Sequence, residues 1–81
     1  MRDNIKDEVI NIISNIAKIP KEQVDIAVPY AELNIDSFAL LEIIFAIEIK
    51  YNITFPQDKL PAIATIEDLI KLTRQMAKKH G

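Results

Sequence analysis

The chain has 81 residues, 49% of them hydrophobic, and a formal net charge of −2, which predicts one small domain over residues 1–81 with a packed core and excludes wholesale disorder. This weakly acidic charge argues against nucleic-acid binding, which needs a concentrated basic face. The absence of cysteine excludes disulfides and thiolate metal ligands.

The first expected helix runs from about Asn4 to Ala17, with Asp3 available as its cap and Pro20 marking its end. Its apolar residues recur at helical spacing and should form one buried stripe: Ile5, Val9, Ile12, Ile13 and Ile16. The N-terminus lacks the apolar core of a signal peptide, and the longest apolar stretch, residues 35–49, is too short and too often interrupted by carboxylates to span a bilayer. We therefore expect a cytoplasmic protein without membrane insertion.

Residues 18–36 contain two prolines and no sustained helical period. Apolar residues alternate from Val24 to Tyr30, which formally suggests a strand, but no second run is available to pair with it. We expect instead a long ordered loop, held to the core by Val24, Val28, Tyr30 and Leu33. Loops this long in small domains are often functional, and this one leads directly to Ser37.

The second helix, from about Ser37 to Tyr51, is hydrophobic nearly all round. One stripe is expected in the core: Leu40, Ile43, Ile44, Ile47 and Tyr51. A second stripe, also at helical spacing, consists of Phe38, Leu41, Phe45 and Ile49. Because so small a domain cannot bury both, we assign the second stripe, flanked by Glu42 and Glu48, to a partner-facing surface. The alternative is a central helix that is buried on all sides.

The remaining residues predict a short third helix and a longer last one. Asn52 suits the left-handed turn that ends the second helix, and Gln57 to Leu60 can form one helical turn before Pro61. The last helix should start at Thr65, whose hydroxyl can cap it, with Asp68 completing an approximate capping box. Its inward face is expected to comprise Ile66, Leu69, Ile70, Thr73 and Met76. The fold class is all-α, a four-helix bundle with a long first loop.

The residue inventory argues against an enzyme. The single histidine, His80, is the penultimate residue, where chains usually fray, and the only glycine, Gly81, excludes a glycine-rich phosphate loop. No cluster of possible ligands has the spacing of a metal site. The pair Asp36-Ser37, in contrast, puts a hydroxyl at a helix N-terminus, where a phosphate is electrostatically favoured. Taken alone, helix capping explains this pair.

Several short segments extend that observation: Leu33-Asn34-Ile35-Asp36-Ser37-Phe38, Leu41-Glu42-Ile43, Ala46-Ile47-Glu48, Phe55-Pro56 and Ala64-Thr65-Ile66. Together they resemble the acyl carrier protein family across essentially the whole chain. The resemblance implies that Ser37 receives 4′-phosphopantetheine from coenzyme A, and that Asp36 helps a transferase to position Mg²⁺ and coenzyme A. The thiol of the arm would carry an acyl intermediate as a thioester, and no residue of the chain would be catalytic.

The resemblance also implies the partners of a monomeric carrier. They are a phosphopantetheinyl transferase, a ligase or transferase that loads the cargo, and downstream biosynthetic enzymes. The residues expected to contact them are Phe38, Leu41, Glu42, Phe45 and Glu48. For the two glutamates the plain alternative is an ordinary solvated helix edge.

The chain departs from the family pattern at a few positions. Asn34 stands where glycine is common, Phe38 replaces the usual leucine, and Ala39 and Ile49 stand where acidic residues are frequent. A dedicated carrier of lipid or specialised-metabolite biosynthesis is therefore as strong an interpretation as the main fatty-acid carrier. Two alternatives remain open. One is a D-alanyl or aminoacyl carrier loaded by an adenylating ligase, which Phe38 and the reduced acidity of the second helix mildly favour, and the other is a non-carrier helical interaction module.

Overall fold

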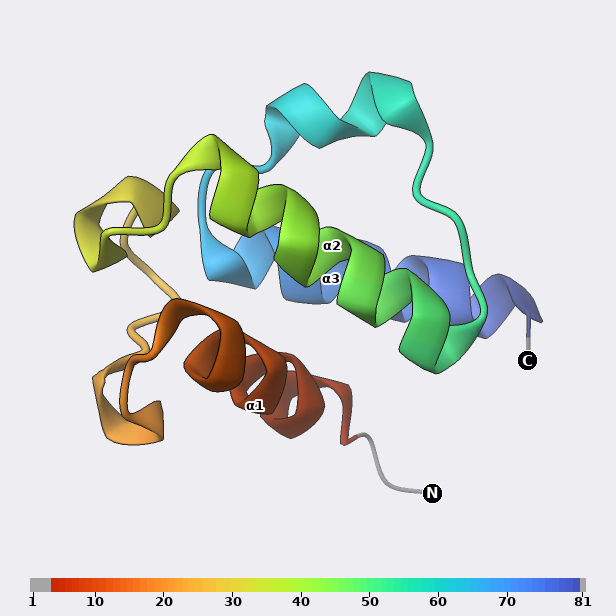
Figure 1. Ribbon diagram of the computed structural model, residues 1–81. Helices are drawn as coiled ribbons and strands as arrows, with labels where there is room; N and C mark the ends of the chain where they lie inside the picture. Colours follow the sequence, from red (N-terminus) through yellow and green to blue (C-terminus); the bar gives the residue numbers. More distant parts are fainter. Residues whose placement is uncertain (1–3, 81) are drawn as a thin grey trace.

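The computed structural model describes residues 4–80, and within this range the chain is helical without any strand (Figure 1). Its α-helices are α1 (Ile5–Ala17), α2 (Ser37–Tyr51) and α3 (Ile66–His80), and its 3₁₀ segments are η1 (Lys21–Gln23), η2 (Tyr30–Leu33) and η3 (Gln57–Ala62). The all-α prediction, with a long first loop and a short third helix, is confirmed. That third helix is η3, which continues through Pro61 to Ala62 instead of ending at Leu60.

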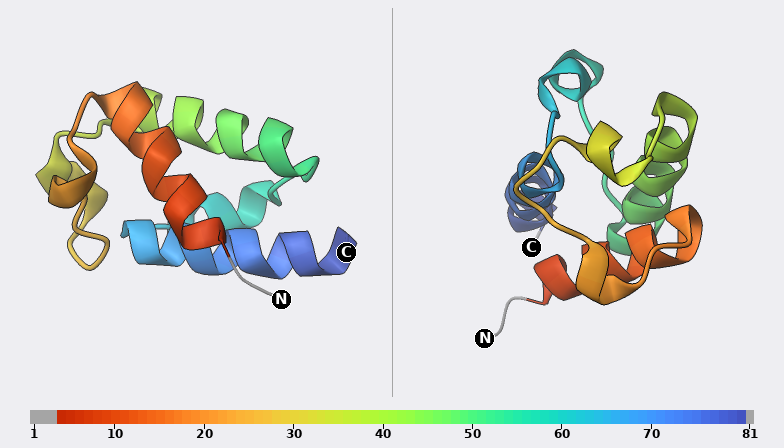
Figure 2. Two further views of the ribbon diagram at one scale, coloured as in Figure 1. Left: turned by 90° about the horizontal axis from the view of Figure 1, so that it is seen from below. Right: turned by 90° about the vertical axis from the view of Figure 1, so that its left-hand side faces the viewer.

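The helices place the start of α2 at one end of the bundle. α2 and α3 run in the same direction, and α1 packs against both (Figures 1 and 2). The long loop and the first turns of α2 and α3 lie at one end, while the first turn of α1 and the last turn of α3 lie at the other. In the described residues, no helix is long and apolar enough to cross a membrane.

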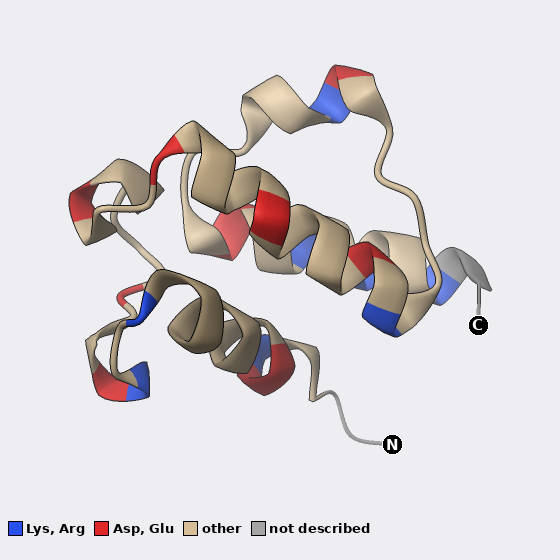
Figure 3. Ribbon diagram, in the orientation of Figure 1, with Lys and Arg blue, Asp and Glu red and all other residues tan. Residues whose placement is uncertain are grey.

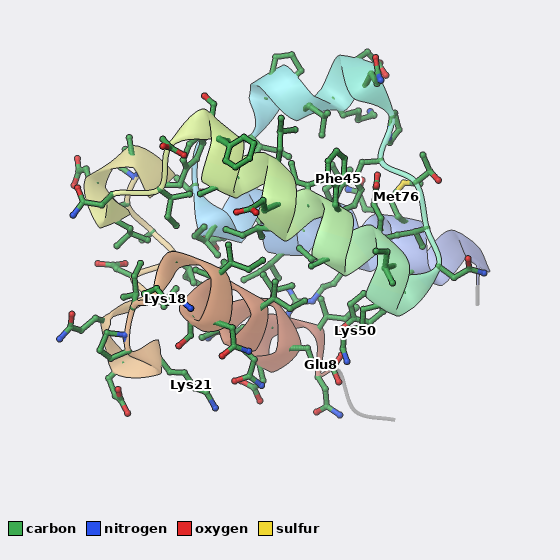
Figure 4. The ribbon with its side chains drawn as sticks, in the orientation of Figure 1. Glu8, Lys18, Lys21, Phe45, Lys50 and Met76 are labelled. Carbon is green, nitrogen blue, oxygen red and sulfur yellow. The ribbon has the colours of Figure 1, made fainter. Side chains whose placement is uncertain are left out.

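One apolar cluster joins the three α-helices. The core stripe of α2 is buried as expected, apart from half-buried Tyr51, whose hydroxyl donates a hydrogen bond to the carboxylate of Glu8 on α1. Figure 4 shows Glu8 beside that end of α2. The α3 residues expected to face inward are buried except for half-buried Met76. On α1, only Val9 and Ile13 are fully buried, so the buried stripe is narrower than the one expected.

The helix ends follow local backbone chemistry. α1 begins at Ile5, one residue later than expected, with Asn4 as its N-cap; Asp3 lies outside the described residues. It ends where Lys18 adopts the left-handed conformation, two residues before Pro20. Asn52 ends α2 in the same conformation, with φ of 56°, as its sequence position predicts.

Candidate functional site

The long first loop is fastened to the start of α3 by backbone hydrogen bonds. The N–H of Tyr30 donates to the carbonyl oxygen of Ala64 (3.0 Å), and the N–H of Glu67 donates to that of Ile26 (3.0 Å). Within the described residues, the alternating segment forms a single antiparallel bridge, between Pro29 and Thr65, and no strand. The loop is therefore an ordered structure, as expected, and α3 fixes its course.

Its last residues turn the chain into α2. Asn34 takes the left-handed conformation, with φ of 62°, which Asn tolerates better than most residues. The next side chain, Ile35, is only 1% exposed and anchors the end of the loop in the core. Ile35 is not among the core residues expected from the sequence, although an apolar residue between polar Asn34 and Asp36 is the signal that could have found it. The end of the loop is thus packed into the core two residues before Ser37.

Asp36 and Ser37 occupy different positions at the start of α2. Asp36 is the N-cap, with an extended backbone, and its Oδ1 accepts a hydrogen bond from the N–H of Ala39 at 2.8 Å. Ser37 is the first residue of the helix and is exposed. Among residues 4–80, its hydroxyl has no hydrogen-bond partner. Because Asp36 supplies the cap, the hydroxyl of Ser37 is accessible for chemistry.

The surroundings of Ser37 fit a phosphate ester. The first N–H groups of an α-helix have no acceptor within the helix, and they form the positive end of the helix dipole. The first turn of α2 contains no acidic residue, although the carboxylate of the N-cap, Asp36, lies directly before Ser37 and takes the N–H of Ala39. Within residues 4–80, no group of three or more His, Cys, Asp and Glu side chains is placed to hold a metal ion.

The second apolar stripe of α2 faces solvent. Phe38 is 72% exposed, Leu41 41%, Phe45 56% and Ile49 82%. These fractions exclude the alternative in which α2 is buried on all sides. Figure 4 shows the ring of Phe45 projecting from α2 on the side of the helix that faces η3. The stripe begins at Phe38, the residue next to Ser37.

The two glutamates beside the stripe are in different environments. Glu42 is exposed, whereas Glu48 is half-buried and its Oε2 accepts a hydrogen bond from the N–H of Phe55 at 2.9 Å. The backbone carbonyl of Glu48 also accepts the N–H groups of Asn52 and Ile53 that close the end of α2. Glu48 therefore joins α2 to the following connection, a contact not expected from the sequence. No sequence signal marks it, because the contact depends on the path of the connection.

Comparisons with known proteins agree with this geometry. A family model described as "Phosphopantetheine attachment site" matches residues 7–73. The chain is similar to an acyl carrier protein of Thermobifida fusca, with 33% identity over 82% of this chain and 85% of that protein. It is also similar to acyl carrier proteins of Cyanophora paradoxa (38% identity, 88% of this chain, 79% of that protein) and Rickettsia typhi (30% identity, 90% and 86%). No solved structure gives a significant match.

Proposed function

Because the chain belongs to the acyl carrier protein family, we propose that Ser37 is the residue to which its 4′-phosphopantetheine arm is attached. The chain carries acyl groups on this covalent arm and is not an enzyme. The observation that carries the proposal is the exposed hydroxyl of Ser37 at the start of α2, where Asp36 provides the cap. The other serine, Ser14, is half-buried, and its hydroxyl donates to the carbonyl oxygen of Ile19.

The residues around Ser37 suit the attachment step. The Ser37 oxygen attacks the phosphorus of coenzyme A that bears the pantetheine. The bond from this phosphorus to the bridging oxygen of the diphosphate breaks, so that adenosine 3′,5′-bisphosphate leaves with that oxygen, and the proton of the hydroxyl passes to a base of the transferase or to solvent. The N-terminus of α2 stabilises the negative charge of the resulting phosphodiester. Asp36 uses Oδ1 for the cap, and we propose that its other oxygen faces the transferase and helps to position Mg²⁺ and coenzyme A. Once attached, the arm supplies the thiol that holds an acyl group as a thioester.

We further propose that Phe38, Leu41, Glu42 and Phe45 contact the enzymes that install the arm, load the cargo and use it. Their exposure beside Ser37 supports this assignment. We also propose that Glu48 contacts partners, through the carboxylate oxygen that does not accept the hydrogen bond from the N–H of Phe55. We place this handover in the cytoplasm and expect the carrier to act as a monomer.

The attachment site is tested by modification in solution. Wild type is incubated with coenzyme A, Mg²⁺ and a broad-specificity phosphopantetheinyl transferase, and its intact mass is measured. We expect one added phosphopantetheine group on wild type and on Ser14→Ala, the matched control, and none on Ser37→Ala. An added group on Ser37→Ala would contradict the proposal, as would an unmodified wild type.

The cargo is proposed to be an acyl group, as the names of the similar proteins indicate, and nothing in these comparisons favours an aminoacyl cargo. Whether the chain serves the main fatty-acid pathway or a dedicated one depends on its loading enzyme. Offering the modified carrier to an acyl-ligating synthetase and to an amino-acid-adenylating ligase separates the two cargo classes by intact mass. Loading by the adenylating ligase alone would contradict the acyl assignment.

A further inference from the structure

The outward face of α3 carries a row of cationic side chains. Lys71, Arg74 and Lys78 are exposed and follow one another at spacings of three and four residues, so they lie on one side of the helix. At 1.5 Å per residue, the row extends for roughly 10 Å. Residues 69–78 contain no acidic residue, and Figure 3 shows red in the first turn of α3 and blue beyond it. The row is therefore not interrupted by negative charge.

A small cavity beside this row adds a fourth cation. It lies between η3 and α3, has a volume of about 200 Å³, and is lined in part by Lys59 of η3 and by Lys71 and Gln75 of α3. Asp68 also lines the cavity, but its Oδ2 already accepts two backbone N–H groups at the start of α3. The cavity thus offers two ammonium groups and an amide donor, a set of groups that suits a phosphate.

This cationic side of the molecule lies away from the outward face of α2. The right-hand view of Figure 2 shows α2 and α3 on opposite sides of the bundle. Within residues 4–78, the large apolar side chains that are exposed all belong to α2. Protein interfaces draw their affinity from apolar and aromatic anchors, and the outward face of α3 offers none of them. A contact on this face therefore depends on charge.

We infer that this cationic face, formed by Lys59, Lys71, Arg74 and Lys78, binds the surface of a membrane that contains anionic phospholipids. A headgroup phosphate lies between Lys59 and Lys71, and the row on α3 lies along the neighbouring headgroups. The helix does not enter the bilayer, because its apolar side is packed in the core of the protein. The inference goes beyond the proposed attachment of the arm and does not depend on it.

The acidic groups of the chain leave this contact favourable, although the net charge is −2. The molecule measures 32 × 29 × 20 Å, and charges on the α2 side are screened from a membrane at α3, since the Debye length is about 10 Å at 0.1 M salt. The exposed acidic residues next to the cationic face are Asp58 and Glu67, which its four cations outnumber. A carrier bound in this way leaves α2 and Ser37 uncovered for the enzymes that use the arm.

The experiment measures co-sedimentation of the unmodified chain with vesicles, made either of phosphatidylglycerol and phosphatidylcholine in equal parts or of phosphatidylcholine alone. At about 100 mM NaCl, we expect binding to the anionic vesicles and at least tenfold weaker binding to the neutral ones. Each Lys or Arg near an anionic surface changes the affinity about fivefold, so Lys71→Gln/Lys78→Gln should lower it at least tenfold.

The matched control, Lys18→Gln/Lys21→Gln, removes the same charge elsewhere. Figure 4 shows Lys18 and Lys21 on the side of α1, and their replacement should lower the affinity for anionic vesicles less than threefold. A loss in the control as large as that in Lys71→Gln/Lys78→Gln would overturn the inference, because net charge alone would then explain the binding. Circular dichroism verifies that both double variants fold.

Other outcomes would also overturn the inference. They are no binding to the anionic vesicles, equal binding to the neutral ones, and a loss below tenfold in Lys71→Gln/Lys78→Gln. Poly-L-glutamate is the probe for an acidic protein. If the chain binds this polymer through Lys71 and Lys78 but does not sediment with vesicles, the face binds an acidic protein and the membrane inference is wrong. Modification of Ser37 is measured separately, so the failure of one proposal leaves the other standing.

Discussion

Neighbouring side chains at the start of α2 differ in their contacts: Asp36 caps the helix, whereas Ser37 is the proposed attachment residue. Asp36 bonds the N–H of Ala39, while the hydroxyl of Ser37 bonds nothing within residues 4–80. Ser37→Ala should therefore change the free energy of unfolding by no more than roughly 1 kcal/mol, because the cap stays in place. Urea or thermal unfolding of the unmodified proteins measures this difference. A much larger loss would mean that Ser37 is chiefly a structural residue.

Substitutions of Asp36 separate its capping role from its proposed role in arm attachment. Asp36→Ala removes the acceptor for the Ala39 N–H and should destabilise the protein by about 1 kcal/mol. Asp36→Asn keeps a side-chain oxygen that can cap, so its stability should stay close to that of wild type. If the carboxylate helps to hold Mg²⁺, Asp36→Asn still slows modification of Ser37. Equal modification rates for wild type and Asp36→Asn would leave Asp36 with capping alone.

At the scale of elements, Glu48 joins α2 to the connection that leads to η3. Its Oε2 accepts a hydrogen bond from the N–H of Phe55, a core residue that is only 3% exposed. Glu48→Ala leaves that N–H without its partner and should cost about 1–3 kcal/mol. Glu48→Gln keeps an acceptor and should cost less. Exchange of the Phe55 amide proton should accelerate in Glu48→Ala.

Glu42→Ala is the matched control for this prediction. Glu42 lies on the same helix but is exposed, so its removal should change stability by no more than about 0.5 kcal/mol. If Glu48→Ala were as mild as Glu42→Ala, the bond to Phe55 would contribute nothing measurable. Glu48 would then revert to the partner-facing role that its position in the sequence suggests.

The N-terminus of α3 introduces a pH dependence. Asp68 Oδ2 accepts the N–H of Ala64 (2.9 Å) and that of Thr65 (3.1 Å), and the Thr65 hydroxyl accepts the N–H of Asp68 (3.1 Å). The bond from Ala64 and then that from Thr65 lower the pKa of Asp68 below its ordinary value of 3.8. A lowered folded-state pKa means that the carboxylate stabilises the fold above pH 3.8, and that this contribution disappears as pH falls through the folded value.

Asp68→Ala should therefore be less stable than wild type at pH 7, and the difference should shrink at lower pH. Thermal melts of both proteins at pH 7 and near pH 3, at matched ionic strength, measure this. Glu67→Ala, also in the first turn but exposed, is the control and should show no such convergence. A gap between Asp68→Ala and wild type that stayed constant from pH 7 to pH 3 would mean that the charge of Asp68 plays no part.

Much of this element structure could be predicted from the residues themselves. The apolar spacing located each α-helix to within one residue at its start, because helical periodicity and capping chemistry are local properties. The capping box of Thr65 and Asp68 and the left-handed Asn52 were predicted for the same reason. The bond from Phe55 to Glu48 was not, since it depends on the path of the chain between them.

At the scale of the whole molecule, the position of the site depends on contacts between distant parts of the chain. The long loop could be predicted from its prolines and from the absence of helical periodicity in its sequence. The position of Ser37 at the end of this loop could be predicted in the same way. The course of the loop could not be predicted, because it depends on hydrogen bonds from Tyr30 to Ala64 and from Glu67 to Ile26. These bonds join backbone atoms, and the identity of the side chains does not specify which backbone atoms pair. The fold thus holds Ser37 from two directions, through α2 and through the start of α3.

Ile35 tests whether this anchoring matters for function as well as for stability. Its side chain is 1% exposed, and it lies two residues before Ser37. Ile35→Ala should cost about 2–5 kcal/mol, and Ile35→Val about 0.5–1.5 kcal/mol, as for other buried isoleucines. The released loop end should also let the first turn of α2 fray, which lowers the fraction of time that Ser37 is presented in its helical position. Modification of Ser37 should then be slower even at temperatures where the variant is folded.

Ile43→Ala distinguishes positioning from general loss of stability. Ile43 is as deeply buried as Ile35 but lies in the middle of α2, away from the loop, so its loss should cost about 2–5 kcal/mol without loosening the start of the helix. At temperatures where circular dichroism shows both variants equally folded, Ile35→Ala should be modified more slowly by the transferase than Ile43→Ala. Equal rates would mean that Ile35 supports only the global fold, and that Asp36 and the N–H groups of α2 suffice to present Ser37.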